Sequence, residues 1–169
     1  MNNRIPSVIN SLLLEYESKI KNSFGNKIFG VYIYNSVALG AFDINKSDID
    51  FITILNGEFT NEEIVRLNTI HRELNNKFKY AKRMEGMYIT VGKVGKTNAD
   101  ITPYIYFANN RLHDYGYYDV NYVTWWTLKN NGIGINSPDV NNLKLNFDWR
   151  AADDFTDSVR RVFERHIIG

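Results

Sequence analysis

Two aspartates separated by a single residue are the first sign of chemistry. Asp48 and Asp50 open the apolar run DIDFITIL at 48–55. In a strand, side chains at i and i+2 project from the same face with Cα atoms about 6.5 Å apart, so both carboxylates can reach one hard cation. Mg²⁺ suits such a pair, because it takes one or two carboxylates and completes its shell with water and phosphate oxygens. The spacing predicts a magnesium site at Asp48 and Asp50.

A polar turn upstream predicts phosphate binding. Asn35 and Ser36 follow the apolar run 28–34 and lead into the small-residue run 37–40. Backbone N–H groups at a helix start, together with a serine hydroxyl, form a cradle for a triphosphate. We therefore expect Asn35, Ser36 and Ser47, which directly precedes the aspartates, to bind the nucleotide. Metal and cradle together describe a site for nucleotidyl transfer.

A third acid stands in an otherwise apolar stretch. Glu85 lies in RMEGMYI at 83–89, where a carboxylate needs a specific reason. On a strand paired with 48–54 it would face the aspartates and act as general base on an acceptor hydroxyl. The alternative is an edge-strand charge or a charge that faces solvent. An isolated D-x-D is likewise common at strand ends and turns.

The elements that would position these residues alternate between helix and strand. Apolar spacing and end signals predict four helices: from Pro6 to Gly25, over 61–78 behind a capping box at Thr60, over 120–131 and over 153–167. Apolar and β-branched runs predict four strands, at 28–34, 48–55, 84–91 and 101–107. The expected fold class is α/β (α+β), a mixed β-sheet flanked by helices.

Composition bounds the remaining function classes. The chain has 169 residues, 44% hydrophobic and 23% charged, with net charge +1 and no cysteine. The near-neutral charge makes a nucleic-acid partner unexpected. We expect neither a signal peptide nor a membrane span, and the lack of cysteine fits a cytoplasmic protein.

Aromatic residues gather in the middle of the chain. Tyr122, Trp125 and Trp126 share one helical face, which favours core or subunit-interface packing over stacking on a base or drug ring. Exposed aromatics in this region would favour a homodimer. His71, on a predicted helix, is expected to pack at an interface.

Three blocks in order resemble a known family. Residues 29–40 (FGVYIYNSVALG) followed by 47–51 (SDIDF) are similar to the signature of the polymerase-beta-like nucleotidyltransferases, and more narrowly of the streptomycin/spectinomycin (aminoglycoside) adenylyltransferases. Residues 83–89 resemble their third motif, which carries the catalytic carboxylate. Residues 124–138 resemble the first helix beyond the catalytic sheet and the segment after it.

The resemblance implies a reaction and a division of the chain. Asp48 and Asp50 would hold Mg²⁺ on the ATP phosphates, Ser36 would bind the β- and γ-phosphates, and Glu85 would deprotonate a hydroxyl of a small acceptor such as an aminoglycoside antibiotic. Residues 1–115 would form the catalytic domain and 116–169 a short C-terminal helical segment.

Two departures from the family pattern leave alternatives open. Asn35 stands where the family has a glycine; asparagine tolerates left-handed backbone but adds bulk beside a phosphate. About thirty residues follow Pro138, fewer than the family's helical domain, so we expect that region to be truncated. The alternatives are a catalytically degenerate nucleotide-binding protein and a minimal nucleotidyltransferase that modifies a protein or RNA partner.

Overall fold

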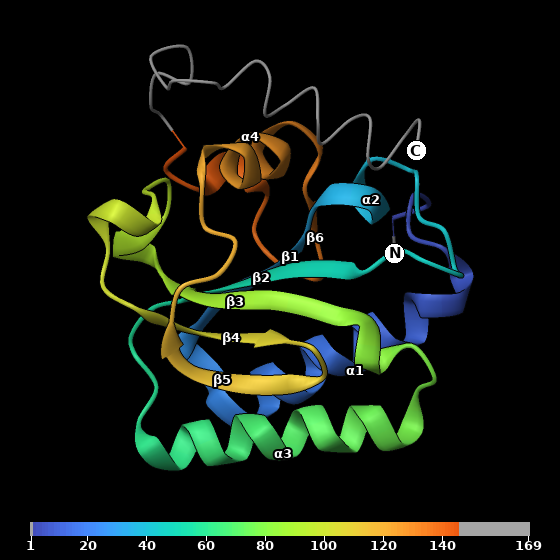
Figure 1. Ribbon diagram of the computed structural model, residues 1–169, viewed down its shortest axis with the longest axis horizontal. Coiled ribbons are helices and arrows are strands. Elements are labelled where there is room, and N and C mark those ends of the chain that lie inside the picture. The colour runs from blue at the N-terminus through green and yellow to red at the C-terminus, as the bar shows by residue number, and fades with distance from the viewer. Residues whose placement is uncertain (1, 146–169) are drawn as a thin grey trace.

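A six-stranded mixed sheet forms the centre of the fold (Figure 1). The computed structural model describes residues 2–145; the helix predicted at 153–167 lies outside the described residues. The strands are β1 (Ile28–Ile33), β2 (Ile49–Leu55), β3 (Met84–Thr90), β4 (Tyr104–Ala108), β5 (Arg111–Gly116) and β6 (Ile133–Gly134), in the spatial order β5-β4-β3-β2-β1-β6. Among the strands of the described residues, only the central neighbours β2 and β3 run parallel.

Helices cover both faces of the sheet. Helices α1 (Ser7–Phe24) and α3 (Asn61–Lys77) lie on one face, and the short α2 (Asn35–Ala38) and α4 (Tyr122–Asn131) lie on the other (Figure 1). Short 3₁₀ helices span Gly25–Lys27, Ala81–Arg83, Val91–Lys93, Asn98–Asp100 and Val140–Asn142. The chain thus has the predicted mixed α+β class. None of the helices within residues 2–145 is long and apolar enough to cross a membrane.

Side chains alternate between the two faces of the sheet along each strand, and this divides the core into two clusters. Phe51 and Tyr88 pack with α1 and α3, whereas Ile52 and Met87 pack on the opposite face with residues of α4. Trp125 of α4 is fully buried in this second cluster, which confirms core packing at that position. The side of the sheet on which any strand residue lies can therefore be read from its neighbours in sequence.

Helix ends follow the signals in the sequence. The capping box predicted at the start of α3 is present, with the Glu63 N–H donating to Thr60 Oγ1 at 3.2 Å and the Thr60 N–H to Glu63 Oε1 at 2.9 Å. Gly25 ends α1 with φ of 52°, a left-handed backbone that glycine adopts without steric penalty.

The β4–β5 hairpin differs from the expectation. The predicted strand 101–107 begins at Tyr104, after the 3₁₀ turn and Pro103, and β5 was not predicted at all. Its sequence RLHDYG is polar because β5 is an edge strand, so it lacks the apolar alternation of a covered strand. Asn109 and Asn110 are both left-handed, at φ 54° and 56°, as a two-residue hairpin turn requires.

Candidate functional site

Asp50 and Glu85 lie side by side on one face of the sheet. They occupy directly paired positions of the parallel β2–β3 ladder. Asp50 alternates with the buried Phe51, and Glu85 precedes Gly86 by one residue, so both carboxylates fall on the face that α2 and α4 cover. Asp48 is exposed and immediately precedes β2, two residues from Asp50. The edge-strand alternative for Glu85 is wrong, because β3 lies in the interior of the sheet; Glu85 itself is half-buried on this face.

The bend between β1 and α2 meets this face at Asn35. The Tyr34 N–H donates to the Asp50 carbonyl at 3.1 Å, and Asn35 then turns left-handed at φ 57°. The Asn35 amide donates to Asp50 Oδ2 at 3.2 Å, while its own oxygen accepts from Thr127 Oγ1 of α4 at 3.5 Å. Asparagine therefore adopts the left-handed backbone that it was expected to tolerate here, and its side chain contacts the predicted metal ligand directly.

The two predicted serines bond to backbone. Ser36 is buried, and its hydroxyl donates to the Asp48 carbonyl at 3.4 Å. The Ser47 hydroxyl accepts from the Asp43 N–H at 2.8 Å, within the loop before β2. The structure thus brings Ser36 next to Asp48 and uses Ser47 to close the preceding loop. Their contact with a nucleotide stays a prediction.

A fourth carboxylate that the sequence did not indicate reaches the site. Asp119 lies in the segment between β5 and α4, and its Oδ2 accepts a hydrogen bond from the Tyr34 hydroxyl at 3.3 Å. Its negative charge raises the pKa of Asp50 and of Tyr118. A single acid in a polar loop carries no spacing signal, so only the tertiary structure could find it.

Tyr118 contacts Glu85 directly. Its hydroxyl donates to Glu85 Oε2 at 2.5 Å, and its ring stacks on Tyr106 of β4 with centroids 5.1 Å apart. The sequence marked this region as aromatic but did not connect it to the acid on β3. The hydrogen-bonded pair links the β5–α4 segment to the predicted general base.

Burial and like charge disfavour the ionised form of Asp50. Burial is the largest cause, followed by the Asp119 carboxylate, and together with Asp48 and Glu85 they raise the pKa of Asp50 to about 8, against the hydrogen bond from Asn35. Carboxylate oxygens are hard donors of the kind that Mg²⁺ prefers. Within residues 2–145 no three His, Asp or Glu side chains are arranged to hold an ion by themselves. An ion on Asp48 and Asp50 would therefore take its other ligands from water and phosphate.

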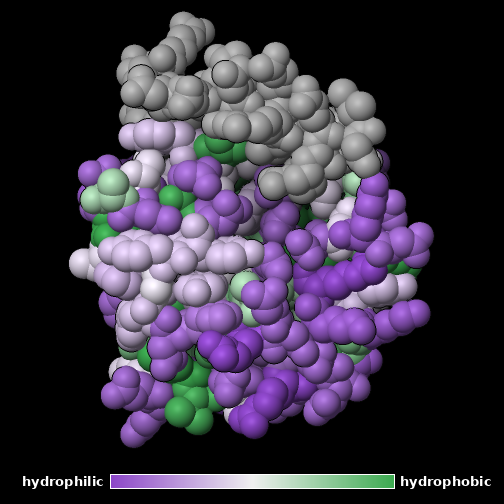
Figure 2. Space-filling view, viewed as in Figure 1, coloured by the Kyte–Doolittle hydropathy of each residue, from purple (hydrophilic) through white to green (hydrophobic). Residues whose placement is uncertain are grey.

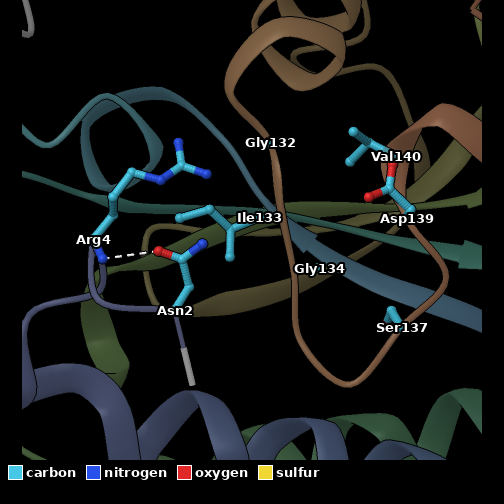
Figure 3. A pocket seen from close by; sticks show the side chains of 8 residues that line it. All are labelled: Asn2, Arg4, Gly132, Ile133, Gly134, Ser137, Asp139 and Val140. Carbon is cyan, nitrogen blue, oxygen red and sulfur yellow. Dashed lines mark hydrogen bonds between the residues drawn. The ribbon is translucent and has the colours of Figure 1, made fainter.

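A separate cavity of about 310 Å³ lies beside β6 (Figure 3). Its lining includes Arg4, Ser137 and Asp139 but none of the carboxylates described above. The Arg4 guanidinium donates to the carbonyls of Ala38 and Asn131 at 2.8 and 2.9 Å, joining the C-terminal ends of α2 and α4. Those contacts give Arg4 a structural role.

Comparison with known proteins supports the fold. No protein-family model matches the sequence. No curated protein matches it either. Among solved structures, the chain is similar to the spectinomycin adenyltransferase AAD(9) from Enterococcus faecialis, crystallised with ATP and spectinomycin, with a TM-score of 0.64 and 14% sequence identity over 92% of this chain. The chain spans 64% of that protein's length. The similarity shows a nucleotidyltransferase-like fold.

Proposed function

We propose that the chain is a Mg²⁺-dependent nucleotidyltransferase that transfers AMP from ATP to a hydroxyl group. The observation that supports this best is the in-register pair Asp50 and Glu85, beside Asp48 and the left-handed bend at Asn35. Two acids would serve the metal and a third would serve the acceptor. This division of roles is the one that a nucleotidyl transfer needs.

The residues would act in sequence around the α-phosphate. Asp48 and Asp50 would hold Mg²⁺, which when bound would neutralise charge on the phosphates. Glu85 accepts the proton of the acceptor hydroxyl, whose oxygen attacks the α-phosphorus, and pyrophosphate leaves. Ser36 and the backbone N–H groups of the bend orient the phosphates. Ser47 supports the loop that positions Asp48.

A small molecule with a reactive hydroxyl is the proposed acceptor. The structural neighbour was crystallised with ATP and spectinomycin, and this supports ATP as donor and an aminoglycoside-type antibiotic as acceptor. A second candidate, a degenerate nucleotide-binding protein, is favoured by the Asn35 amide bonded to Asp50, which occupies one oxygen of a predicted metal ligand. The third, a protein or RNA acceptor, shares the same site and differs only in the substrate.

Titration calorimetry of ATP with and without Mg²⁺ tests the site. We expect Mg²⁺-dependent ATP binding by the wild type and its loss in the Asp48→Ala/Asp50→Ala double variant. Equal binding by both proteins would contradict the proposal that Asp48 and Asp50 bind the metal. Transfer of labelled AMP to spectinomycin then separates an active enzyme from a degenerate one. Incubation with a cell lysate and labelled ATP reveals a macromolecular acceptor.

A further inference from the structure

Tyr118 is a partly exposed tyrosine fixed by four separate contacts. The residue is 37% exposed. Its N–H donates to the Tyr104 hydroxyl at 2.6 Å, and its carbonyl accepts from the Asn98 side-chain amide at 3.2 Å. Its ring stacks on Tyr106 at an interplanar angle of 7°, and its hydroxyl donates to Glu85 at 2.5 Å. The fold therefore sets the position of this hydroxyl.

That position is the one an acceptor hydroxyl would take. A general base must lie within hydrogen-bond reach of the hydroxyl that it deprotonates. Tyr118 Oη meets this condition at Glu85, whose paired neighbour across the ladder is Asp50. A tyrosine hydroxyl carries its proton at neutral pH, so the base has a proton to remove.

The adjacent tyrosine differs in this respect. Tyr117 is more exposed, at 47%, but its hydroxyl donates to the Ile101 carbonyl at 2.9 Å. Its ring packs edge-on against Tyr104, with centroids 6.0 Å apart. Exposure alone therefore does not distinguish the two residues, whereas contact with Glu85 does.

We propose that Tyr118 is itself a nucleotide acceptor, so that the chain attaches AMP to its own Tyr118 hydroxyl. The inference rests on the proposed function and adds a modification site to it. Glu85 takes the proton from Tyr118 Oη, the oxygen forms a bond to the α-phosphorus of ATP, and the bond to the β-phosphate breaks. The products are a tyrosyl-AMP phosphodiester and pyrophosphate. Because the modified oxygen has no further proton to give, the reaction stops at one nucleotide per chain.

Intact-mass analysis after incubation with ATP and Mg²⁺, followed by peptide mapping, tests the inference. We expect one adenylyl group on Tyr118 in the wild type and in the control Tyr117→Phe. Tyr118→Phe should carry none. Glu85→Gln should form the adduct at least about 100-fold more slowly than the wild type, because it lacks the base. The rate should be first order and independent of protein concentration, since Tyr118 lies on the Glu85 of its own chain.

Mg²⁺-ATP binding, measured by calorimetry on each variant, separates the outcomes. Tyr118→Phe that binds Mg²⁺-ATP like the wild type but forms no adduct supports the site. An equal adduct on Tyr118→Phe, or a wild type that binds Mg²⁺-ATP or modifies spectinomycin but never itself, overturns the inference and leaves the proposed function standing. A wild type that neither binds Mg²⁺-ATP nor transfers AMP overturns both.

Discussion

Asp50 and Glu85 are directly paired across the two parallel strands at the centre of the sheet, and the Glu85 carboxylate is one of the charges that raise the pKa of Asp50. This pairing brings together acids that are far apart in sequence. It also places Asp50 where its ionised form costs stability, so that a neutral group would serve the fold better. Such a conflict is common at functional sites.

Asp50→Asn should stabilise the metal-free protein at alkaline pH. The native pKa of Asp50 is raised to about 8, from an ordinary 3.8, so the native state binds more protons than the unfolded chain between these values. Stability from this group is therefore lost as pH rises from about 4 to about 8. The variant should exceed the wild type by at least about 1 kcal/mol in free energy of unfolding at pH 8.5, and by much less at pH 5.

Urea unfolding at the two pH values measures this difference. Asp48→Asn, at an exposed position, is the matched control and should show no comparable change. Adding Mg²⁺ should raise the stability of the wild type at pH 8.5 and leave Asp50→Asn unaffected. A constant gap between wild type and Asp50→Asn across the pH range would contradict the burial argument.

Asn35→Gly and Asn35→Ala should differ in stability. Both lose the hydrogen bond to Asp50, but only alanine strains the backbone at φ 57°, which costs about 1 kcal/mol more than glycine. Asn35→Gly should also bind Mg²⁺-ATP within about tenfold of the wild type, because asparagine already adopts the required bend. Thermal unfolding and calorimetry check the two expectations. Nucleotide binding that appears only in Asn35→Gly would favour the degenerate protein.

The sequence could predict the parts of the site that lie on regular elements. Asp48 and Asp50 follow the period of a strand, Glu85 stands out in an apolar run, and Asn35 was expected to tolerate a left-handed bend. Alternation and composition carry this information because the elements are covered on at least one face.

Tyr118 and Asp119 could not be placed in the same way. They reach the site from the irregular segment between β5 and α4, whose path depends on a polar edge strand that has no apolar pattern. Long-range contact of a loop has no period in sequence.

The predicted homodimer and the division at residue 115 remain predictions. Hydrophilic residues cover most of the face in Figure 2, and hydrophobic ones form small separate areas.

His71 should make stability depend on pH below neutrality. It is buried, stacks on Phe107 at 3.9 Å, and lies 2.6 Å from the Tyr88 hydroxyl through Nε2. Burial lowers the pKa of His71 to about 3, from an ordinary 6.5, so the unfolded chain binds more protons between these values and stability falls as pH drops below 6.5. Between pH 7.5 and pH 5, the free energy of unfolding of His71→Phe should fall by about 2 kcal/mol less than that of the wild type.

Urea unfolding over this pH range checks that expectation. The variant should be less stable at pH 7.5 by about 1 kcal/mol, because the Tyr88 hydroxyl loses a partner. An unchanged slope in His71→Phe would show that this histidine does not resist protonation.

Gly86→Ala should disrupt the paired acids without touching either. A Cβ at residue 86 would lie 2.2 Å from the Phe51 carbonyl oxygen and 2.6 Å from its ring, so the β2–β3 pair would have to separate beside Asp50 and Glu85. Overpacking of this kind costs about 2–3 kcal/mol, and we expect loss of Mg²⁺-dependent ATP binding at temperatures where the variant is still folded. Gly57→Ala, where a Cβ meets no atom within 4 Å, should change stability by less than about 0.5 kcal/mol and bind ATP normally. Circular dichroism and calorimetry on both variants measure folding and ATP binding. A folded Gly86→Ala that binds Mg²⁺-ATP like the wild type would show that the close pairing of β2 and β3 is not what assembles the site.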